Sequence, residues 1–179
     1  MLIDQFLPQY EFSERHTIDV HASMQDTYTA LRLFDMGDSF IVRSLYRLRG
    51  LPTKALTLDG MLKWGFILLA EEPPCELVFG LIGRFWTLTG GITSMAAKDF
   101  ASFDQAGSAK VAANFSLTQL PDGTVRAATE TRIHCVDDAS RLRFRLYWTV
   151  IGPFSAWIRV EWLKLIKHKA ESLSKASAS

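Results

Sequence analysis

The stretch YWTVIGPFSAWIRVEWLKLIKHKAES, residues 147–172, decides how the end of this chain folds. The uncharged run in this region extends only from Leu146 to Ile158, between Arg145 and Arg159. It is well short of the roughly 20 apolar residues that a membrane-spanning helix needs. Read as a helix, the segment has residues recurring at alternating steps of four and three along one stripe, which is Phe144, Trp148, Ile151, Ser155, Ile158, Trp162 and Leu165. The pattern predicts a long amphipathic helix that lies on an apolar surface.

Both ends of this helix and a bend inside it are marked in the sequence. Asp137, Asp138 and Ser140 are N-cap candidates, and their negative charge suits the start of a helix. The lysine-rich end suits the negative pole of the helix dipole. Pro153 removes one intrahelical hydrogen bond and clashes with the preceding turn, so we expect a kink or a break near residues 149–152.

The segment before the helix, residues 107–138, predicts a β-hairpin whose turn is Pro121-Asp122-Gly123. Apolar and small residues alternate with polar ones on both arms, which is typical of an antiparallel sheet with one core face and one wet face. The expected core face carries Ala109, Val111, Ala113, Phe115, Leu117, Val125, Ala127, Thr129, Thr131, Ile133 and Cys135. The expected wet face carries Lys110, Asn114, Ser116, Thr118, Arg126, Glu130, Arg132 and His134, with Glu130 and Arg132 as a structural ion pair.

Other elements are predicted upstream. We expect strands at residues 14–22, 61–70 and 76–83, with two prolines stopping the ladder between the last two. Ser23 and Asp26 have the spacing of a capping box before a helix that runs through about Phe34. A second short helix is expected at residues 40–48, whereas residues 84–106 show no clear periodicity.

The resulting order is a strand, two short helices, a run of antiparallel strands and one long C-terminal helix. It resembles the START-like or helix-grip superfamily, also called the SRPBCC or polyketide cyclase and lipid-transport group. The resemblance is carried by AEEPPCELVFG (70–80), SAKVAANFSLTQLPDGTVRAATETRIHCVDDASRLRFRLYW (108–148) and PFSAWIR (153–159), which look like an uncharacterised bacterial branch.

This resemblance implies an α+β helix-grip fold, in which a curved antiparallel sheet of about six or seven strands wraps around the C-terminal helix. We expect a single START-like domain at residues 12–171, an N-terminal extension at 1–11 and a flexible tail at 172–179.

Members of that superfamily mostly bind hydrophobic small molecules, so the resemblance implies a lipid-like or polyketide-like ligand in a cavity between sheet and helix. The small inward-facing residues Ala109, Ala113 and Ala127 leave space for one. The candidate lining is Trp64, Phe66, Phe79, Val111, Phe115, Trp148 and Ile151, with Thr129 and Thr131 as orienting hydroxyls. The alternative is that bulky side chains such as Trp148 and Trp162 fill the space as ordinary core.

Catalytic chemistry is not indicated. His16, His21, His134 and His168 show neither metal-ligand spacing nor a comparable pairing with a carboxylate, so we interpret them as structural or surface residues. The two glycines of GLIGRFW are better explained by a bulge or loop than by a nucleotide site. We expect no catalytic residue, no metal and no cofactor, hence binding without turnover. A cyclase or dehydratase of the same superfamily is the enzymatic alternative.

The composition favours a soluble, cytoplasmic protein that does not bind nucleic acid. The chain has 179 residues, 48% of them apolar, and a formal net charge of +1. Cys75 and Cys135 form no CxxC pair, and the N-terminus carries Asp4 but lacks the sustained apolar run of a signal peptide. The oligomeric state is not indicated. A second interpretation is a lipid-binding module at a membrane surface, through Trp157, Arg159, Trp162, Lys164, Lys167 and Lys169.

Overall fold

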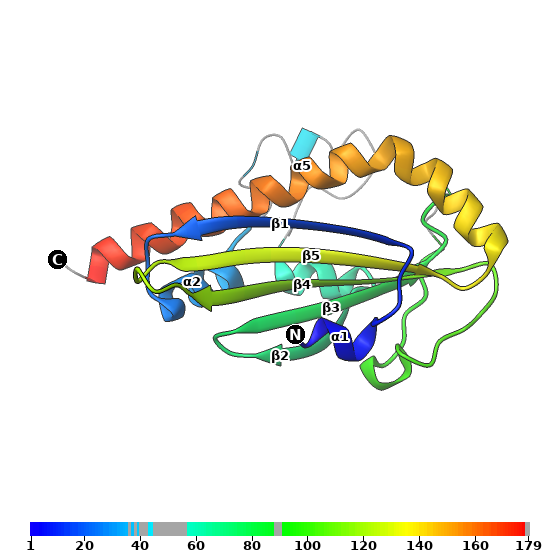
Figure 1. The fold of residues 1–179 in the computed structure, drawn as a ribbon, viewed down its shortest axis with the longest axis horizontal. Helices are drawn as coiled ribbons and strands as arrows, with labels where there is room; N and C mark the ends of the chain where they lie inside the picture. Colours follow the sequence, from blue (N-terminus) through cyan, green and yellow to red (C-terminus); the bar gives the residue numbers. More distant parts are fainter. Residues whose placement is uncertain (36, 38, 40–42, 45–56, 88–90, 178–179) are drawn as a thin grey trace.

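The chain folds as an α+β unit with one antiparallel sheet and a long C-terminal helix (Figure 1). The computed structural model describes residues 1–35, 37, 39, 43–44, 57–87 and 91–177. The elements are α1 (Ile3–Phe6), β1 (Phe12–Val20), α2 (Met24–Leu33), α4 (Leu58–Lys63), β2 (Ile67–Glu72), β3 (Glu76–Gly83), the 3-10 helix η2 (Ala97–Asp99), β4 (Ala109–Gln119), β5 (Val125–Cys135) and α5 (Asp138–Ser177).

The strands follow the order β1-β5-β4-β3-β2, and every neighbouring pair is antiparallel. The described residues form a five-stranded sheet, fewer than the predicted six or seven. The hairpin β4–β5 is confirmed, with Phe115 opposite Thr129. Its turn uses Gly123 at a φ of 87°, a backbone conformation that favours glycine.

The predicted strand at residues 61–70 is wrong in its first half. Residues 58–63 form the short helix α4, because the Thr57 hydroxyl caps the helix by accepting a hydrogen bond from the Gly60 amide at 3.2 Å. Gly65, at a φ of 93°, follows the helix, and β2 begins only at Ile67. The predicted strand at residues 76–83 is confirmed as β3, and the first strand lies at residues 12–20 instead of 14–22.

Helix α2 begins as its capping pattern predicts. The Ser23 hydroxyl accepts a hydrogen bond from the Asp26 amide at 3.0 Å and donates one to the Asp26 carboxylate at 2.7 Å. The second predicted helix, at residues 40–48, falls almost wholly outside the described residues.

Helix α5 is 40 residues long and begins at the predicted cap. Asp137 accepts hydrogen bonds from the Ser140 amide at 2.8 Å and from the Ser140 hydroxyl at 2.9 Å. Hydrogen bonds from the amides of Gly107 and Ser140 hold the pKa of Asp137 below its usual value. The helix runs through Pro153 without a break to Ser177, and Figure 1 shows that it changes direction along its length.

The two ends of the α5 stripe are its anchors on the sheet. Phe144 is buried in one apolar cluster, and Trp162 is buried in another together with Leu163 and Ile166. Between Phe144 and Trp162 the helix is exposed or half-buried at every position except Gly152. The middle of the helix is therefore its most loosely packed part. No helix in the described part of the chain combines the length and the apolar character that crossing a bilayer requires.

The face of the hairpin that we expected to be wet is buried in its middle part, while Thr118 and Arg126 near the turn are exposed as predicted. Lys110, Asn114, Glu130 and Arg132 are all buried. A second apolar core covers this side of the sheet and contains Ile3, Leu7, Ile67, Leu69, Val78, Ile82, Phe100 and Ala112. Alternation alone predicts a wet face, but α1 and the segment around η2 pack over it. The segment before Phe12, expected to be an extension, thus contributes Ile3 and Leu7 to the core.

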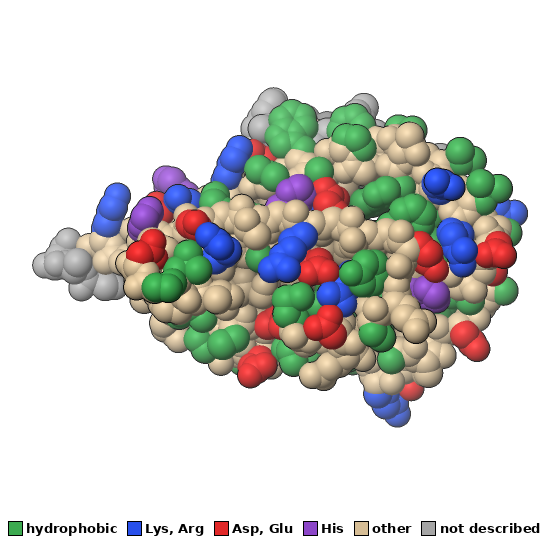
Figure 2. Space-filling model, viewed as in Figure 1, with side chains coloured by type: hydrophobic (Ala, Val, Ile, Leu, Met, Phe, Trp, Pro, Cys, Tyr) green, Lys and Arg blue, Asp and Glu red, His purple; other side chains and the backbone are tan. Residues whose placement is uncertain are grey.

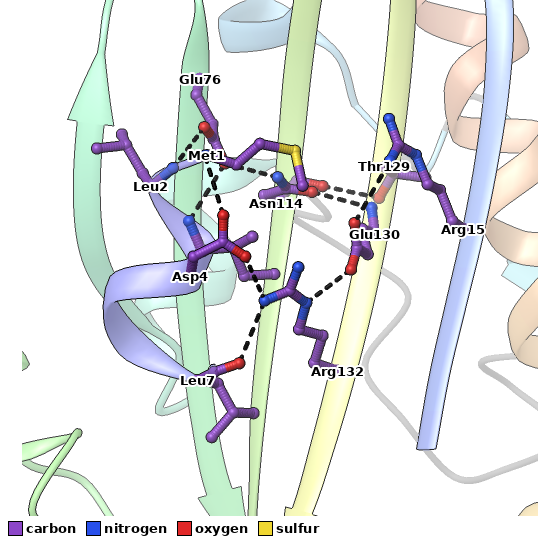
Figure 3. Close-up of polar contacts among 11 residues, drawn as sticks. Met1, Leu2, Asp4, Leu7, Arg15, Glu76, Asn114, Thr129, Glu130 and Arg132 are labelled. Carbon is purple, nitrogen blue, oxygen red and sulfur yellow. Dashed lines mark hydrogen bonds and ion pairs between the residues drawn. The ribbon is translucent and has the colours of Figure 1, made fainter. Parts of the chain in front are cut away.

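Glu76 ties helix α1 to this face of the sheet (Figure 3). Its carboxylate accepts hydrogen bonds from the Leu2 amide at 2.7 Å, from the Ile3 amide at 3.3 Å and from the Asn114 side-chain amide at 2.6 Å. The side-chain carbonyl oxygen of Asn114 in turn accepts a hydrogen bond from the Glu130 backbone amide at 2.9 Å. Backbone amides at the start of α1 are thus satisfied by a carboxylate from β3.

Arg132 completes the network shown in Figure 3. Its Nε donates to Glu130 at 2.6 Å, which confirms the predicted ion pair, and its Nη1 donates to Asp4 at 2.7 Å. The N-terminal ammonium and Arg132 both hold the pKa of Asp4 below its usual value. Because Glu76, Asn114, Glu130 and Arg132 bind one another or the backbone, the buried charges on this face are compensated.

The first prediction tests which face of α5 packs on the sheet. Phe144 is 1% exposed, whereas Leu146, two residues away, is 67% exposed. Phe144→Ala should lower the free energy of unfolding by about 3 to 5 kcal/mol, because it leaves a cavity in a packed cluster. The control Leu146→Ala should change stability by less than about 1 kcal/mol. Equal losses in urea titrations of the two variants would contradict this orientation.

The second prediction compares two arginines of the same strand. Arg132 and Glu130 have side chains 7% and 10% exposed, whereas Arg126 and Asp19 form an exposed pair. Arg132→Met should lower the free energy of unfolding by about 3 to 5 kcal/mol, since it leaves the buried Glu130 carboxylate with only the exposed Arg15, 3.8 Å away, as a charged partner. The matched variant Arg126→Met should lower it by about 0 to 1 kcal/mol. Similar denaturation midpoints would show that the Arg132 network is not a buried one.

The third prediction concerns the two cysteines, both of which are free. Cys135 is buried, and burial, helped by the negative charge of Glu11, raises the pKa of its thiol to about 12. Cys75 is exposed. Because the thiolate is the reactive form, a thiol reagent should label one cysteine in the native protein and two after unfolding. If peptide mapping finds that Cys135 is labelled as fast as Cys75 in the native protein, Cys135 is not buried.

Candidate functional site

The predicted lining residues divide between two apolar clusters on the α5 side of the sheet. Phe79 and Phe115 belong to the cluster beneath the C-terminal half of α5, and Trp64 and Phe66 pack beside it. Val111 and Trp148 belong instead to the cluster around Phe144, while Ile151 is half-buried. Thr129 and Thr131 are buried. The fold therefore does not bring the nine residues into one cavity.

Aromatic rings fill most of the space beneath the C-terminal half of α5. The Phe115 ring lies 6.0 Å from Phe79, 5.8 Å from Phe34 and 6.1 Å from Trp162, measured between ring centroids. Phe66 lies 6.0 Å from Phe79. Contacts of this kind are those of a packed core. The room left by Ala113 and Ala127 is thus occupied by Trp162 and Phe34 from neighbouring helices.

A small hollow remains beside this aromatic core, near β2 and α4. Its volume is about 270 Å³ when the open solvent at its mouth is included. The space inside it has room for only about one water molecule. Its lining is Arg32, Leu58, Met61, Leu62, Phe66, Leu68 and Phe79. Arg32 lies 3.5 Å from Glu71, which also accepts a hydrogen bond from the Tyr28 hydroxyl. The charge at this hollow is already neutralised within the chain, and the hollow is too small for a lipid-like molecule.

Polar side chains lie between the two apolar clusters, on the same face of the sheet. Glu14 and His16 lie on the same face of β1 as Phe12 and Ile18, and between them along the strand. Phe12 packs in the Phe144 cluster and Ile18 in the Phe115 cluster. The register places Glu14 opposite Thr131 and His16 opposite Thr129. We call these four residues, Glu14, His16, Thr129 and Thr131, the polar strip.

Three members of the polar strip, Glu14, His16 and Thr129, make hydrogen bonds within the protein. His16 Nε2 lies 2.7 Å from Glu14 Oε1. The Thr129 hydroxyl donates to the Asn114 backbone carbonyl at 2.9 Å.

Three buried polar atoms at or near the strip have no hydrogen-bond partner among the described residues. They are Glu14 Oε2, Thr131 Oγ1 and Trp162 Nε1. Thr131 is 1% exposed and Trp162 is 6% exposed, so bulk water does not reach them freely. A buried polar group without a partner costs about 1 to 3 kcal/mol, and folded proteins contain few of them. Glu14 and Thr131 lie between the two apolar clusters and Trp162 belongs to one of them, so these atoms mark the polar strip as the candidate site.

The cover of the polar strip is the loosely packed middle of α5. Pro153 lies in this segment and removes one backbone hydrogen bond. Arg159 is half-buried there, with its guanidinium carbon 5.9 Å from the centre of the Trp162 ring. The site thus has a firm polar floor on the strands and a cover that is anchored mainly at its two ends.

The sequence interpretation of the histidines is corrected by the Glu14–His16 pair. We expected no pairing between a histidine and a carboxylate, but a spacing of two on a strand places both side chains on one face. The signal was present in the alternation of Phe12, Glu14, His16 and Ile18. In the described residues no group of three His, Cys, Asp or Glu side chains has a geometry suited to a metal ion.

The basic aromatic surface expected at the end of α5 is not available as a whole. Trp162 is buried in the core. Lys164 pairs with Glu161 at 2.8 Å, Lys167 donates to the Asp19 carbonyl at 2.8 Å, and Lys169 donates to the Leu33 carbonyl at 2.7 Å. Lys167 and Lys169 thus hold α5 against β1 and α2, whereas the Lys164 pair lies within α5.

Comparisons with known proteins do not name a family. No protein-family model and no curated protein matches this chain. Among solved structures, the crystal structure of TTHA0849 from Thermus thermophilus is similar, with a TM-score of 0.33 and 7% identity over 94% of this chain and 100% of that one. Similarity at this level supports no conclusion about function.

Proposed function

We propose that this chain binds a small, mainly apolar molecule between the sheet and α5, over the polar strip, and releases it unchanged. The observation that carries the proposal is the set of unpartnered buried atoms, Glu14 Oε2, Thr131 Oγ1 and Trp162 Nε1. Apolar clusters lie on either side of the polar strip, and Trp162 belongs to one of them, so a ligand with an apolar body and one polar group matches the chemistry. A helix-grip fold of the START-like type is part of the same proposal.

The unpartnered atoms indicate which polar group the ligand carries. A carboxylate oxygen accepts hydrogen bonds, an indole N–H donates, and a threonine hydroxyl does both. A hydroxyl group on the ligand is able to donate to Glu14 and accept from Thr131 or Trp162. A lipid-like or polyketide-like alcohol or phenol therefore fits better than a pure hydrocarbon.

Binding requires the middle of α5 to move. The hollow beside Phe79 has room for about one water, and aromatic rings occupy the space around Phe115, so the apolar body of the ligand needs new space. The half-buried segment between Phe144 and Trp162 has the fewest contacts to lose. We infer that this segment lifts while the anchors at its two ends stay in place.

The fourth prediction compares two threonines of β5 that differ in one hydrogen bond. Thr131→Val replaces an unpartnered hydroxyl by a methyl group, so it should raise the free energy of unfolding by about 1 kcal/mol. It should also weaken the binding of a fluorescent naphthol, followed by titration, more than that of the matched naphthalene. The control Thr129→Val removes the hydrogen bond to Asn114 and should lower stability by about 1 kcal/mol.

Two outcomes would contradict the proposal. If Thr131→Val lowers stability as much as Thr129→Val, the hydroxyl has a partner such as a bound water. If the parent binds neither probe, or binds both with affinities that Thr131→Val leaves unchanged, the site is not at the polar strip. Native mass spectrometry of the purified protein then serves to search for a retained molecule elsewhere.

The Glu14–His16 pair favours an acid–base enzyme as the second candidate function. A carboxylate 2.7 Å from an imidazole nitrogen orients the ring. A cyclase or dehydratase needs such a group beside a bound substrate. Recovery of the bound alcohol unchanged after long incubation supports binding alone, whereas conversion that is lost in Glu14→Gln supports the enzyme.

A further inference from the structure

Helix α5 has a second apolar stripe, on the side turned away from the sheet. Its members are Leu142, Leu146, Val150, Phe154 and Trp157, and all of them are exposed. Steps of four, four, four and three place these residues within an arc of about 120° on the helix. We call this set the outer stripe. Figure 2 shows hydrophobic side chains along the upper right edge of the molecule, where Figure 1 places the N-terminal half of α5.

The charges along the outer stripe are mainly positive. Residues 139–160 contain four arginines and no aspartate or glutamate, and the acids at the two ends, Asp138 and Glu161, are paired with Arg141 and Lys164. Arg141 turns to the side and lies 3.7 Å from Glu11 and 3.3 Å from Asp138. Arg143 and Arg145 are exposed, and helix geometry places one at each flank of the outer stripe. Among the described residues, the unpaired charges beside the stripe are therefore Arg143 and Arg145, and an apolar stripe with these neighbours is complementary to a surface that is apolar within and anionic at its rim.

We propose that the outer stripe docks α5 onto an anionic lipid surface, with the helix lying in the plane of the interface. Apolar side chains at this spacing enter the boundary between headgroups and acyl chains, and arginines extend their guanidinium groups to lipid phosphates. Trp157, at the end of the stripe, has the amphipathic ring that is favoured at this depth. The proposal goes beyond ligand binding, because the outer stripe and the polar strip lie on opposite sides of α5.

A second copy of the chain fits the outer stripe less well. In a symmetric pair whose α5 helices run parallel, Arg143 and Arg145 of one protomer would face the same charges of its partner, and in an antiparallel pair they would face the apolar far end of the partner's stripe. Like charges brought together without an acidic partner are unfavourable, and residues 139–160 supply no acidic residue. An anionic lipid surface relieves the same charges.

The fifth prediction is tested by sedimentation of the full chain with vesicles of phosphatidylglycerol and phosphatidylcholine in equal parts. The parent should bind these vesicles and be released at about 1 M NaCl, where the screening length is about 3 Å. Replacing Leu146 and Val150 together by glutamate should weaken binding at least about ten-fold, because two exposed apolar contacts are lost and negative charge is added. Arg143→Gln with Arg145→Gln should weaken binding to anionic vesicles only.

The control is Leu33→Glu, at an exposed leucine on α2. It adds one of the same negative charges, half of what the double variant adds, outside the outer stripe and should leave vesicle binding unchanged. Thermal melting of every variant shows that the fold is kept, since all the substituted side chains are exposed. Binding that survives the Leu146 and Val150 double variant overturns the proposal, as does equal binding to vesicles of phosphatidylcholine alone. Sedimentation velocity that finds a dimer in the parent and a monomer in the double variant, without vesicle binding, assigns the stripe to self-association and overturns it too.

Discussion

The hairpin β4–β5 is buried on both of its faces except near its turn, where Thr118 and Arg126 are exposed, and the rest of the structure depends on this constraint. Its strands lie in the middle of the five-stranded sheet, so neither has a free edge. Helix α5 covers one face through Phe144 and Trp162, and α1 with Phe100 covers the other. Each polar side chain on these strands must therefore find a partner inside the protein or remain unsatisfied.

The two faces of the sheet meet this requirement in opposite ways. On the α1 side, Glu76, Asn114, Glu130 and Arg132 form a connected network in which each charge faces an opposite charge or a backbone group. On the α5 side, the polar strip keeps only part of its hydrogen-bonding capacity occupied. A closed network stabilises one arrangement, whereas open hydrogen-bonding capacity is available to a guest. This contrast supports a structural role for the first face and a binding role for the second.

Helix α5 combines a packed stripe, an outer stripe and a proline within one element. The packed stripe grips the sheet at its two ends, and the segment around Pro153 between them is only half-buried. A ligand beneath this segment and a lipid surface above it would both contact the same stretch of helix. An apolar molecule would then have a short path from a membrane to the site. The segment of α5 proposed to cover the site is also the segment proposed to contact the lipid.

Local patterns in the sequence determined most of the elements of this protein, because short-range geometry controls them. Alternation determined the hairpin around Gly123, capping groups at Ser23 and Asp137 determined where two helices begin, and the steps of three and four determined the packed face of α5. The α4 helix was missed because its signal is one hydrogen bond to Thr57. Only the tertiary structure decided what covers each surface. It buried Lys110 and Arg132, and it packed Phe34 and Trp162 in the cluster where a cavity was predicted. It also left the Thr131 hydroxyl without a hydrogen-bond partner among the described residues. Periodicity shows which residues share a face, but burial of that face depends on segments distant in the sequence, such as α1, whose packing no local pattern specifies.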